Sequence, residues 1–148
     1  MSIREFTSED GQAVERLVLA SFREFVSQDC TEEGIQNFKA FASVSSLITM
    51  SKAGEILVAV EGDAIVGVVG RVKDRIRYLF VDKEWQGRGI ASALLRQSEE
   101  QARRESYVKL YVRSSLYAQE FYKKQGYKRT TRIIQSHGVA FRPMSKSL

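Results

Sequence analysis

The sequence predicts a single α+β domain in which helices flank a mixed central β-sheet. Two β-rich runs at 56–60 and 64–69, separated by three turn-forming residues, predict a β-hairpin. Strand-like runs at 75–81 and 107–112 enclose a long helical pattern at 87–104, and strands connected through a helix normally lie parallel. The 148 residues are 43% hydrophobic, which provides enough apolar surface for one core, and no linker or repeat divides them.

The first part of the chain predicts one strand and two helices. Residues 2–6 alternate between apolar and polar types, as a half-buried strand does. Residues 7–10 provide a capping hydroxyl and first-turn carboxylates for a helix that we expect to end at about Phe25. A second helix should follow residues 29–31. Residues 45–54 are polar and end in a glycine, so we expect a connection there.

The remaining elements complete the order β-α-α-β-β-β-α-β-α-β-β. The helix at 87–104 carries an apolar inner face and a charged outer face. A further helix is expected at 115–125, because a glycine follows it as a suitable C-terminal stop. Runs at 127–135 and 139–144 predict a last hairpin around a His-Gly pair.

Composition argues against several classes of protein. One proline and 28% charged residues argue against a disordered chain. No apolar run approaches the about 20 residues that span a bilayer, and residues 1–5 do not resemble a signal peptide, so we expect a cytoplasmic protein without a membrane partner. The single Cys30 excludes an internal disulfide. Together with the single His137, it also argues against a structural metal site.

Charge is distributed unevenly along the chain. Residues 1–70 hold 5 Lys/Arg and 11 Asp/Glu, a net charge of −6, whereas residues 71–148 hold 18 and 7, a net charge of +11. A half this basic is expected to meet an anion, which could be a phosphorylated cofactor, a nucleic acid or an acidic surface.

A glycine-containing loop lies between the strand at 75–81 and the long helix. Its residues are Gln86-Gly87-Arg88-Gly89-Ile90-Ala91-Ser92. Glycines there permit a tight bend and leave backbone N–H groups uncovered at a helix N-terminus, where the unpaired donors and the helix dipole favour a phosphate. Arg88 could add a charged contact from the rim.

Three ligand-binding interpretations of this loop compete with one another and with a fourth in which it binds nothing. A P-loop is excluded because the chain has no Gly-Lys-Ser/Thr sequence. A dinucleotide fingerprint would need glycine or alanine at Ser92 and an acidic residue at Arg113. The loop could also be a tight strand-to-helix turn that binds nothing, or a loop for the pyrophosphate of coenzyme A.

Residues 79–91 resemble the central motif of the GNAT superfamily of acyl-CoA-dependent N-acetyltransferases. The family pattern Gln/Arg-x-x-Gly-x-Gly/Ala is matched by Gln86, Gly89 and Ala91. Residues 118–127 are similar to a second family segment, Ala-x-x-Phe/Leu-Tyr-x-x-x-Gly-Phe/Tyr. One departure is Ser115, where many members carry an asparagine.

This resemblance covers the whole chain and implies a GNAT-like fold with residues 1–148 as one N-acetyltransferase domain. It implies an acyltransferase that binds coenzyme A and uses acetyl-CoA as the acetyl donor, with the pantetheine arm beside the strand and against the second segment. The residues expected to bind the cofactor are the strand residues Leu79, Phe80 and Val81, the loop residues Gln86, Gly87, Arg88, Gly89, Ile90, Ala91 and Ser92, and Ser115, Ala118 and Phe121.

Acetyl transfer to an amine requires an oxyanion donor and a proton for the departing thiolate. A backbone N–H near Phe80 or Val81 could polarise the thioester carbonyl. Tyr122 is the candidate general acid, because a phenol has a pKa close to that of a thiol and the resemblance implies that this tyrosine lies beside the sulfur. The simpler interpretation is that Tyr122 is an aromatic residue of the core.

The sequence does not identify a general base. Glu24 and Asp29 are possible, and so is deprotonation through water. The acidic N-terminal half would suit a cationic amine. In contrast, Arg75 and Arg77, which should share one strand face with Leu79 and Val81, could hold a carboxylate of the acceptor.

The preferred function is therefore transfer of acetyl from acetyl-CoA to a primary amine by direct attack in a ternary complex, with a small-molecule acceptor favoured and a monomer or homodimer expected. The alternatives are a basic nucleic-acid-binding module, an enzyme acting on an RNA-borne or protein amine, and an acyl-CoA sensor without catalysis. The chain has no helix-turn-helix or aromatic-basic sheet motif, which argues against the nucleic-acid module.

Overall fold

The computed structural model describes all residues from 1 to 148 and contains eight strands in one mixed sheet. The strands are β1 (Ser2–Glu5), β2 (Glu55–Glu61), β3 (Ala64–Val72), β4 (Arg75–Val81), β5 (Lys109–Ser114), β6 (Lys128–Arg129), β7 (Ile134–Ser136) and β8 (Val139–Ser147). The helices are α1 (Gly11–Phe25), α2 (Glu32–Phe41), α3 (Val44–Ala53), α4 (Ile90–Arg104) and α5 (Gln119–Lys124). None of these helices is long and apolar enough to cross a membrane.

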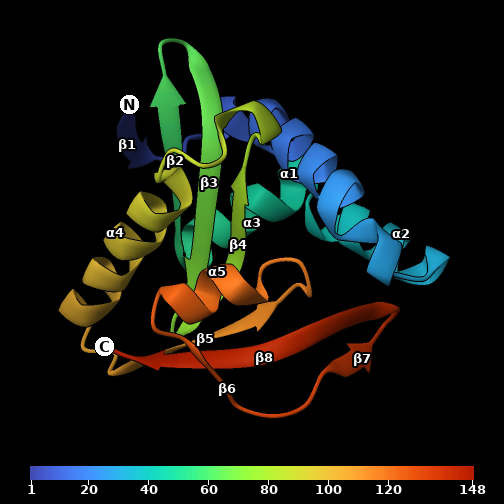
Figure 1. Ribbon diagram of the computed structural model, residues 1–148. Coiled ribbons are helices and arrows are strands. Elements are labelled where there is room, and N and C mark those ends of the chain that lie inside the picture. The colour runs from blue at the N-terminus through green and yellow to red at the C-terminus, as the bar shows by residue number, and fades with distance from the viewer.

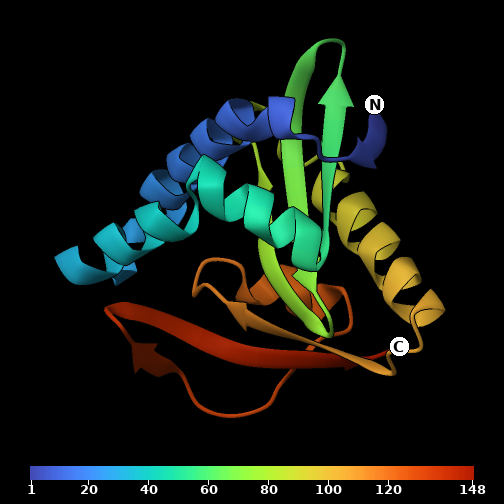
Figure 2. The same cartoon turned by 180° about the vertical axis from the view of Figure 1, so that it is seen from behind.

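The strand order is β1-β2-β3-β4-β5-β8-β6, with β7 paired to β8, and all pairs are antiparallel except β4 with β5. Helix α4 covers one face of β2–β4, while α1 and α3 cover the other (Figures 1 and 2). Two apolar clusters fill these layers, one beneath α4 and one beneath α1 and α3. The predicted α+β class and the mixed sheet flanked by helices are confirmed.

The expectation of a connection at 45–54 is wrong, because this segment forms helix α3. Ser43 caps it by accepting a hydrogen bond from the Ser46 amide at 3.2 Å. Leu47 and Met50, three residues apart, are buried against the sheet and α1. The segment is half apolar, and Leu47, Ile48 and Met50 pack it against the core, although its apolar residues do not form a clear stripe at helical spacing.

The last hairpin also differs from the prediction. Its turn has positive φ at His137 and Gly138, as expected for a tight hairpin turn. The first arm, however, is interrupted between β6 and β7: the Thr130 N–H still donates to the Pro143 carbonyl at 3.0 Å, and residues 131–133 then leave the ladder. Proline has no N–H to donate to a ladder at this point.

Several boundaries also shift by a few residues. Helix α4 begins at Ile90 rather than at residue 87, and α5 begins at Gln119 rather than at residue 115. The segments before both helices are irregular backbone that lines the functional cavity described below.

The most important feature of the sheet is a gap between the parallel strands β4 and β5. Their pairing is limited to Arg75 with Tyr111 and Ile76 with Val112. At the next position, β4 has a bulge, since Arg71 and Gly70 of β3 pair with Ile76 and Tyr78 and leave Arg77 without a partner. Beyond the bulge the two strands separate.

The bulge also corrects the predicted strand face. Residues Leu79 and Val81 pack beneath α4 together with Ile76, an even-numbered residue, whereas Tyr78 and Phe80 pack on the opposite face. Arg75, Arg77, Leu79 and Val81 therefore do not follow one uninterrupted alternation.

Candidate active site

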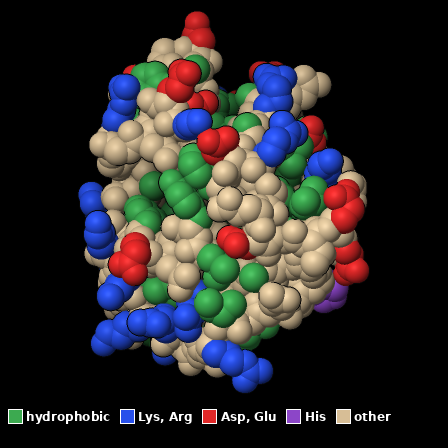
Figure 3. Space-filling model, turned by 45° about the vertical axis from the view of Figure 1, so that its right-hand side comes forward, with side chains coloured by type: hydrophobic (Ala, Val, Ile, Leu, Met, Phe, Trp, Pro, Cys, Tyr) green, Lys and Arg blue, Asp and Glu red, His purple; other side chains and the backbone are tan.

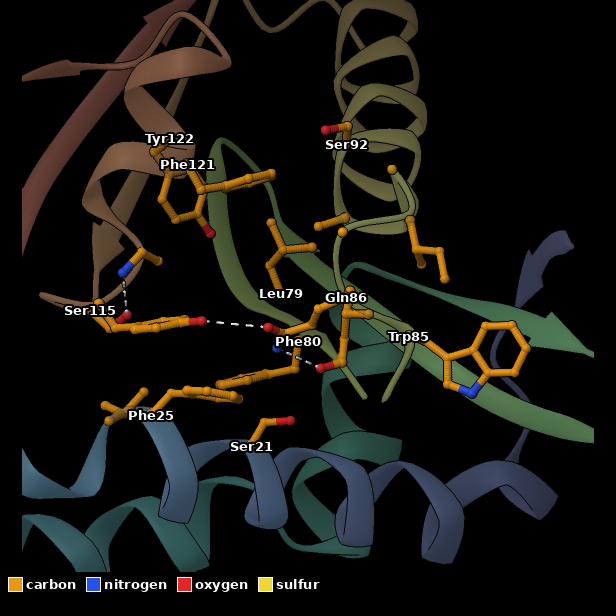
Figure 4. Close-up of a pocket in the computed structure, with 18 residues that line it drawn as sticks. Ser21, Phe25, Leu79, Phe80, Trp85, Gln86, Ser92, Ser115, Phe121 and Tyr122 are labelled. Atoms are coloured by element: carbon orange, nitrogen blue, oxygen red, sulfur yellow. Dashed lines mark hydrogen bonds between the residues drawn. The ribbon is translucent and has the colours of Figure 1, made fainter. Parts of the chain in front are cut away.

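A cavity of about 380 Å³ opens where β4 and β5 separate. The end of β4, the loop before α4, the start of α5 and the C-terminal end of α1 surround it (Figure 4). All the predicted site residues except Arg88 line it: Leu79, Phe80, Val81, Gln86, Gly87, Gly89, Ile90, Ala91, Ser92, Ser115, Ala118, Phe121 and Tyr122. Their parts in binding and catalysis stay predictions.

The loop at the start of α4 has backbone donors without partners. No amide between Gly87 and Ser92 donates a hydrogen bond within the chain. Gly87 and Gly89 adopt left-handed backbone with φ values of 78° and 80°, and a Cβ at either position would meet no atom within 4 Å. The loop therefore presents open N–H groups at the N-terminus of a 15-residue helix, a geometry that receives an anion.

Hydrogen bonds from side chains hold this loop in position. The side-chain amide of Gln86 donates a hydrogen bond to the Val81 carbonyl at 3.2 Å, which connects the loop to the end of β4. The hydroxyl of Ser92 accepts a hydrogen bond from Gln125 at 3.0 Å, which connects α4 to the end of α5. Arg88 lies outside the lining, because its guanidinium stacks over Trp85 with 4.5 Å to the ring centre.

The edge of β4 that faces the gap provides further backbone groups. The Asp82 amide donates to Val66 of β3, so the alternation of an antiparallel ladder directs the Phe80 N–H toward β3 as well. The N–H groups of Leu79 and Val81 then point into the gap. Of the two positions predicted for an oxyanion donor, Val81 has the suitable direction.

Tyr122 differs from the other buried tyrosines in its hydroxyl group. Its side chain is only 5% exposed and packs edge-on against Phe121 and Tyr127. Tyr127 donates to Glu99 at 2.8 Å and Tyr78 donates to the Phe41 carbonyl, but the Tyr122 hydroxyl has no partner in the chain and points into the cavity. Burial raises the pKa of Tyr122, so the phenol stays protonated.

Ser115 lies in the turn between β5 and α5. Its hydroxyl accepts a hydrogen bond from the Ala118 amide at 3.2 Å and so supports the turn that leads into α5 (Figure 4). This contact fixes the Ser115 side chain at the wall of the cavity.

Five lining residues were not predicted from the sequence: Ser21, Phe25, Val26, Trp85 and Tyr117. Phe25 and Tyr117 stack with ring centres 4.6 Å apart, and the Tyr117 hydroxyl donates to Gln86 at 3.4 Å. These contacts close the cavity between α1 and α5. The one available signal was Phe25, which extends the apolar stripe of α1 to its last residue.

The carboxylates considered as bases do not line the cavity. Glu24 forms an ion pair with Lys83 at 2.9 Å, and both side chains are exposed. Asp29 lies in a short 3₁₀ turn. The neighbouring Cys30 forms an isolated bridge with Val139, and burial raises the pKa of its thiol, which makes it a poor nucleophile.

A second, smaller cavity of about 130 Å³ adjoins the first. It shares Tyr122, Ser115, Leu79 and Phe80 with the first, so the two cavities meet at the same wall. Figure 3 shows hydrophobic side chains exposed across the middle of one face of the molecule, with lysine and arginine side chains above and below them. The Tyr122 side chain is thus part of the wall of both cavities.

Comparison with known families gives one match over most of the chain. Residues 26–148 match the family model of the acetyltransferase (GNAT) domain. No curated protein sequence matches the chain.

Solved structures share the fold over nearly the whole chain. A GCN5-related N-acetyltransferase from Rhodopseudomonas palustris is 24% identical with a TM-score of 0.87, covering 99% of this chain and 95% of that one. The PaiA N-acetyltransferase from Thermoplasma acidophilum, solved with coenzyme A, is 18% identical with a TM-score of 0.80, covering 99% and 98%. The aminoglycoside 6'-N-acetyltransferase from Enterococcus faecium is 17% identical with a TM-score of 0.76, covering 99% and 97%.

Proposed function

The chain belongs to the GNAT family of acetyl-CoA-dependent acetyltransferases, and we propose that it transfers the acetyl group directly to the primary amine of a small molecule in a ternary complex. The observation that carries the mechanism is the buried Tyr122 hydroxyl, which has no partner in the chain and lies where the two cavities meet.

The larger cavity fits the chemistry of the donor. The unpaired amides between Gly87 and Ser92 match a pyrophosphate, and the free edge of β4 at Leu79 and Val81 matches the amides of a pantetheine arm. Apolar side chains provide most of the remaining wall. Acetyl-CoA supplies an activated thioester there, whose carbonyl carbon is open to attack by an amine.

Two groups of this chain would act on the developing charges. The Val81 N–H would donate to the thioester oxygen, where negative charge grows during attack, and a preorganised donor of this kind contributes about 3–4 kcal/mol to lowering the barrier. Tyr122 would donate its proton to the departing sulfur. Its raised pKa means that the hydroxyl holds its proton before the reaction begins.

The amine must lose a proton before or during attack. No Asp, Glu or His side chain lines either cavity. We therefore assign that proton to water at the mouth of the gap rather than to a side-chain base.

Two observations favour a small-molecule acceptor. The second cavity measures only about 130 Å³, which suits a small amine. Similar folds include aminoglycoside 6'-N-acetyltransferases, whose named substrates are small molecules with amino groups.

Thermal unfolding with and without acetyl-CoA tests the donor site. At about 100 times its Kd the ligand should stabilise the protein by about 2.7 kcal/mol, which shifts Tm by several degrees in a domain of this size. Gly89→Trp should abolish this shift, since its side chain would occupy the open space above the loop.

Gly62→Trp is the matched control. Gly62 also has a positive φ with no atom within 4 Å of a Cβ, but it lies in the β2–β3 turn, outside both cavities. Both variants place a tryptophan at a positive φ, 59° at Gly62 and 80° at Gly89, so the ligand-induced shift is the informative difference between them. No shift for the unaltered protein at millimolar acetyl-CoA would overturn the proposal.

A further inference from the structure

The charged side chains of the smaller cavity are both arginines. Arg77 and Arg113 line it, and neither aspartate nor glutamate does. The expectation that an acidic N-terminal half surrounds the acceptor therefore finds no support in the lining. The walls contributed by that half are apolar instead, provided by Phe22, Val26 and Phe38.

Neither arginine has a partner in the chain. Arg71 forms an ion pair with Glu105 at 2.7 Å and Arg4 forms one with Asp10 at 2.8 Å, whereas Arg77 and Arg113 form no ion pair and no side-chain hydrogen bond. Both side chains reach solvent, so each guanidinium keeps its hydrogen-bond donors available to an anion that enters this cavity.

Aromatic rings hold both guanidiniums in place. Arg77 lies over Phe41 with 5.2 Å to the ring centre, and Arg113 lies over Phe141 with 5.1 Å. Stacking uses the flat face of a guanidinium and leaves its N–H edge free for a planar anion such as a carboxylate. The two side chains are therefore oriented without being neutralised.

Strand geometry brings the two arginines to the same level. The last paired residues of β4 and β5 are Ile76 and Val112, and the arginines are the next residue on each strand, where the gap begins. Arg75 and Arg113 also line a neighbouring hollow, so a third guanidinium is close. Desolvation lowers the pKa of Arg77, and the positive charges of Arg75 and Arg113 lower it further. The contribution of these two charges indicates a positive local potential.

We propose that the acceptor is a small amino carboxylate with an apolar body, such as an α-amino acid, whose carboxylate is bound by Arg77 and Arg113. This inference rests on the proposed acetyl transfer and specifies its acceptor. The apolar part of the molecule would contact Phe22, Val26 and Phe38, and the amine would face the gap beside Tyr122. A polycationic amine would be repelled by the same arginines.

The test compares amino acids with their carboxamides, and each kcat/KM is expressed per neutral amine, because replacing the carboxylate by a carboxamide lowers the pKa of the neighbouring amine. Alanine, valine, leucine and phenylalanine are each paired with the corresponding carboxamide, and a polyamine is added; release of CoA from acetyl-CoA is measured. We expect kcat/KM to favour the acid over its amide by about tenfold or more, since charge-assisted hydrogen bonds to a carboxylate are the strong ones. Arg77→Gln and Arg113→Gln should each remove most of this preference.

Arg16→Gln is the control, because Arg16 is an exposed residue of α1 without an ion pair and outside both cavities. The control should keep the preference for acids. Binding gives a second readout: in the presence of CoA, the preferred acid should raise Tm and its amide should not.

The two proposals fail in different ways. If acetyl-CoA shifts Tm but amides or the polyamine are acetylated as fast as the acids, the amino carboxylate is excluded while acetyl transfer stands. If acetyl-CoA causes no shift, acetyl transfer itself is overturned.

Discussion

The two cavities that meet at Tyr122 are prepared for anions by different means. The larger one has no charged side chain in its lining and offers backbone amides from one continuous loop at a helix N-terminus. The smaller one offers guanidiniums from two separate strands, each stacked on an aromatic ring. Backbone donors do not depend on side-chain identity, whereas guanidiniums do. The donor side should therefore tolerate most side-chain substitutions, and the acceptor side should change its specificity with a single one.

The shared wall gives the largest expected effect. Tyr122→Phe should lower kcat by about 100-fold or more, which is the usual contribution of a general acid, and should leave the Tm shift with acetyl-CoA intact. Tyr127→Phe is the matched control, because Tyr127 is equally buried but donates to Glu99. It should reduce stability while the folded enzyme keeps its kcat. Equal kcat values for the two variants would exclude Tyr122 as the acid.

The next expected effect is on the free energy of unfolding. It distinguishes an arginine that stabilises the fold from one that we propose binds a ligand. Arg71 is only 1% exposed and bonds to Glu105, so Glu105→Gln should lower the free energy of unfolding by about 1–2 kcal/mol, a value reduced by the partial exposure of Glu105. Arg77→Gln removes no contact of this kind and should change stability by about 0.5 kcal/mol or less. Urea denaturation measures both. A large loss of stability in Arg77→Gln would make that arginine structural.

A smaller effect tests whether the donor side depends on side-chain charge. Arg88 stacks on Trp85 outside the cavity, so Arg88→Gln should raise the KM for acetyl-CoA only about twofold, as expected for an exposed charge. If its KM instead rises as much as that of Gly89→Trp, the guanidinium rather than the loop amides holds the phosphates.

The same contrast explains what sequence reasoning could find. The donor-side residues lie in two short stretches, 79–92 and 115–122, where local turn and helix chemistry is readable, and together they line one cavity except for Arg88. The acceptor cavity combines α1, α2, β4, β5 and β8, which meet only in the folded chain. The placement of Arg77 near Arg113 depends on the bulge at Arg77, and no local residue pattern predicts that bulge.

Elements were missed for a related reason. Helix α3 mixes five apolar with five polar residues without a clear helical stripe, and its inner face becomes apparent only when Leu47 and Met50 are seen against the sheet. The interruption between β6 and β7 depends on Pro143, which lies on the opposite arm of the hairpin. In both cases the decisive partner is distant in sequence, so tertiary packing overrides the local pattern.

The smallest expected effect concerns the pH dependence of kcat, which should not decline at high pH. An acid is active while protonated, so a tyrosine with an ordinary pKa of about 10 would lose activity as pH approaches that value. Burial raises the pKa of Tyr122, which moves this loss to higher pH. On the acid side, kcat/KM should rise with pH, because only the neutral amine attacks and no carboxylate or histidine in the lining titrates in its place. Between about pH 6 and 10, kcat/KM should therefore rise and kcat should not fall at the high end, and a fall in kcat beginning near pH 8 or 9 would show that the acid is a group other than Tyr122.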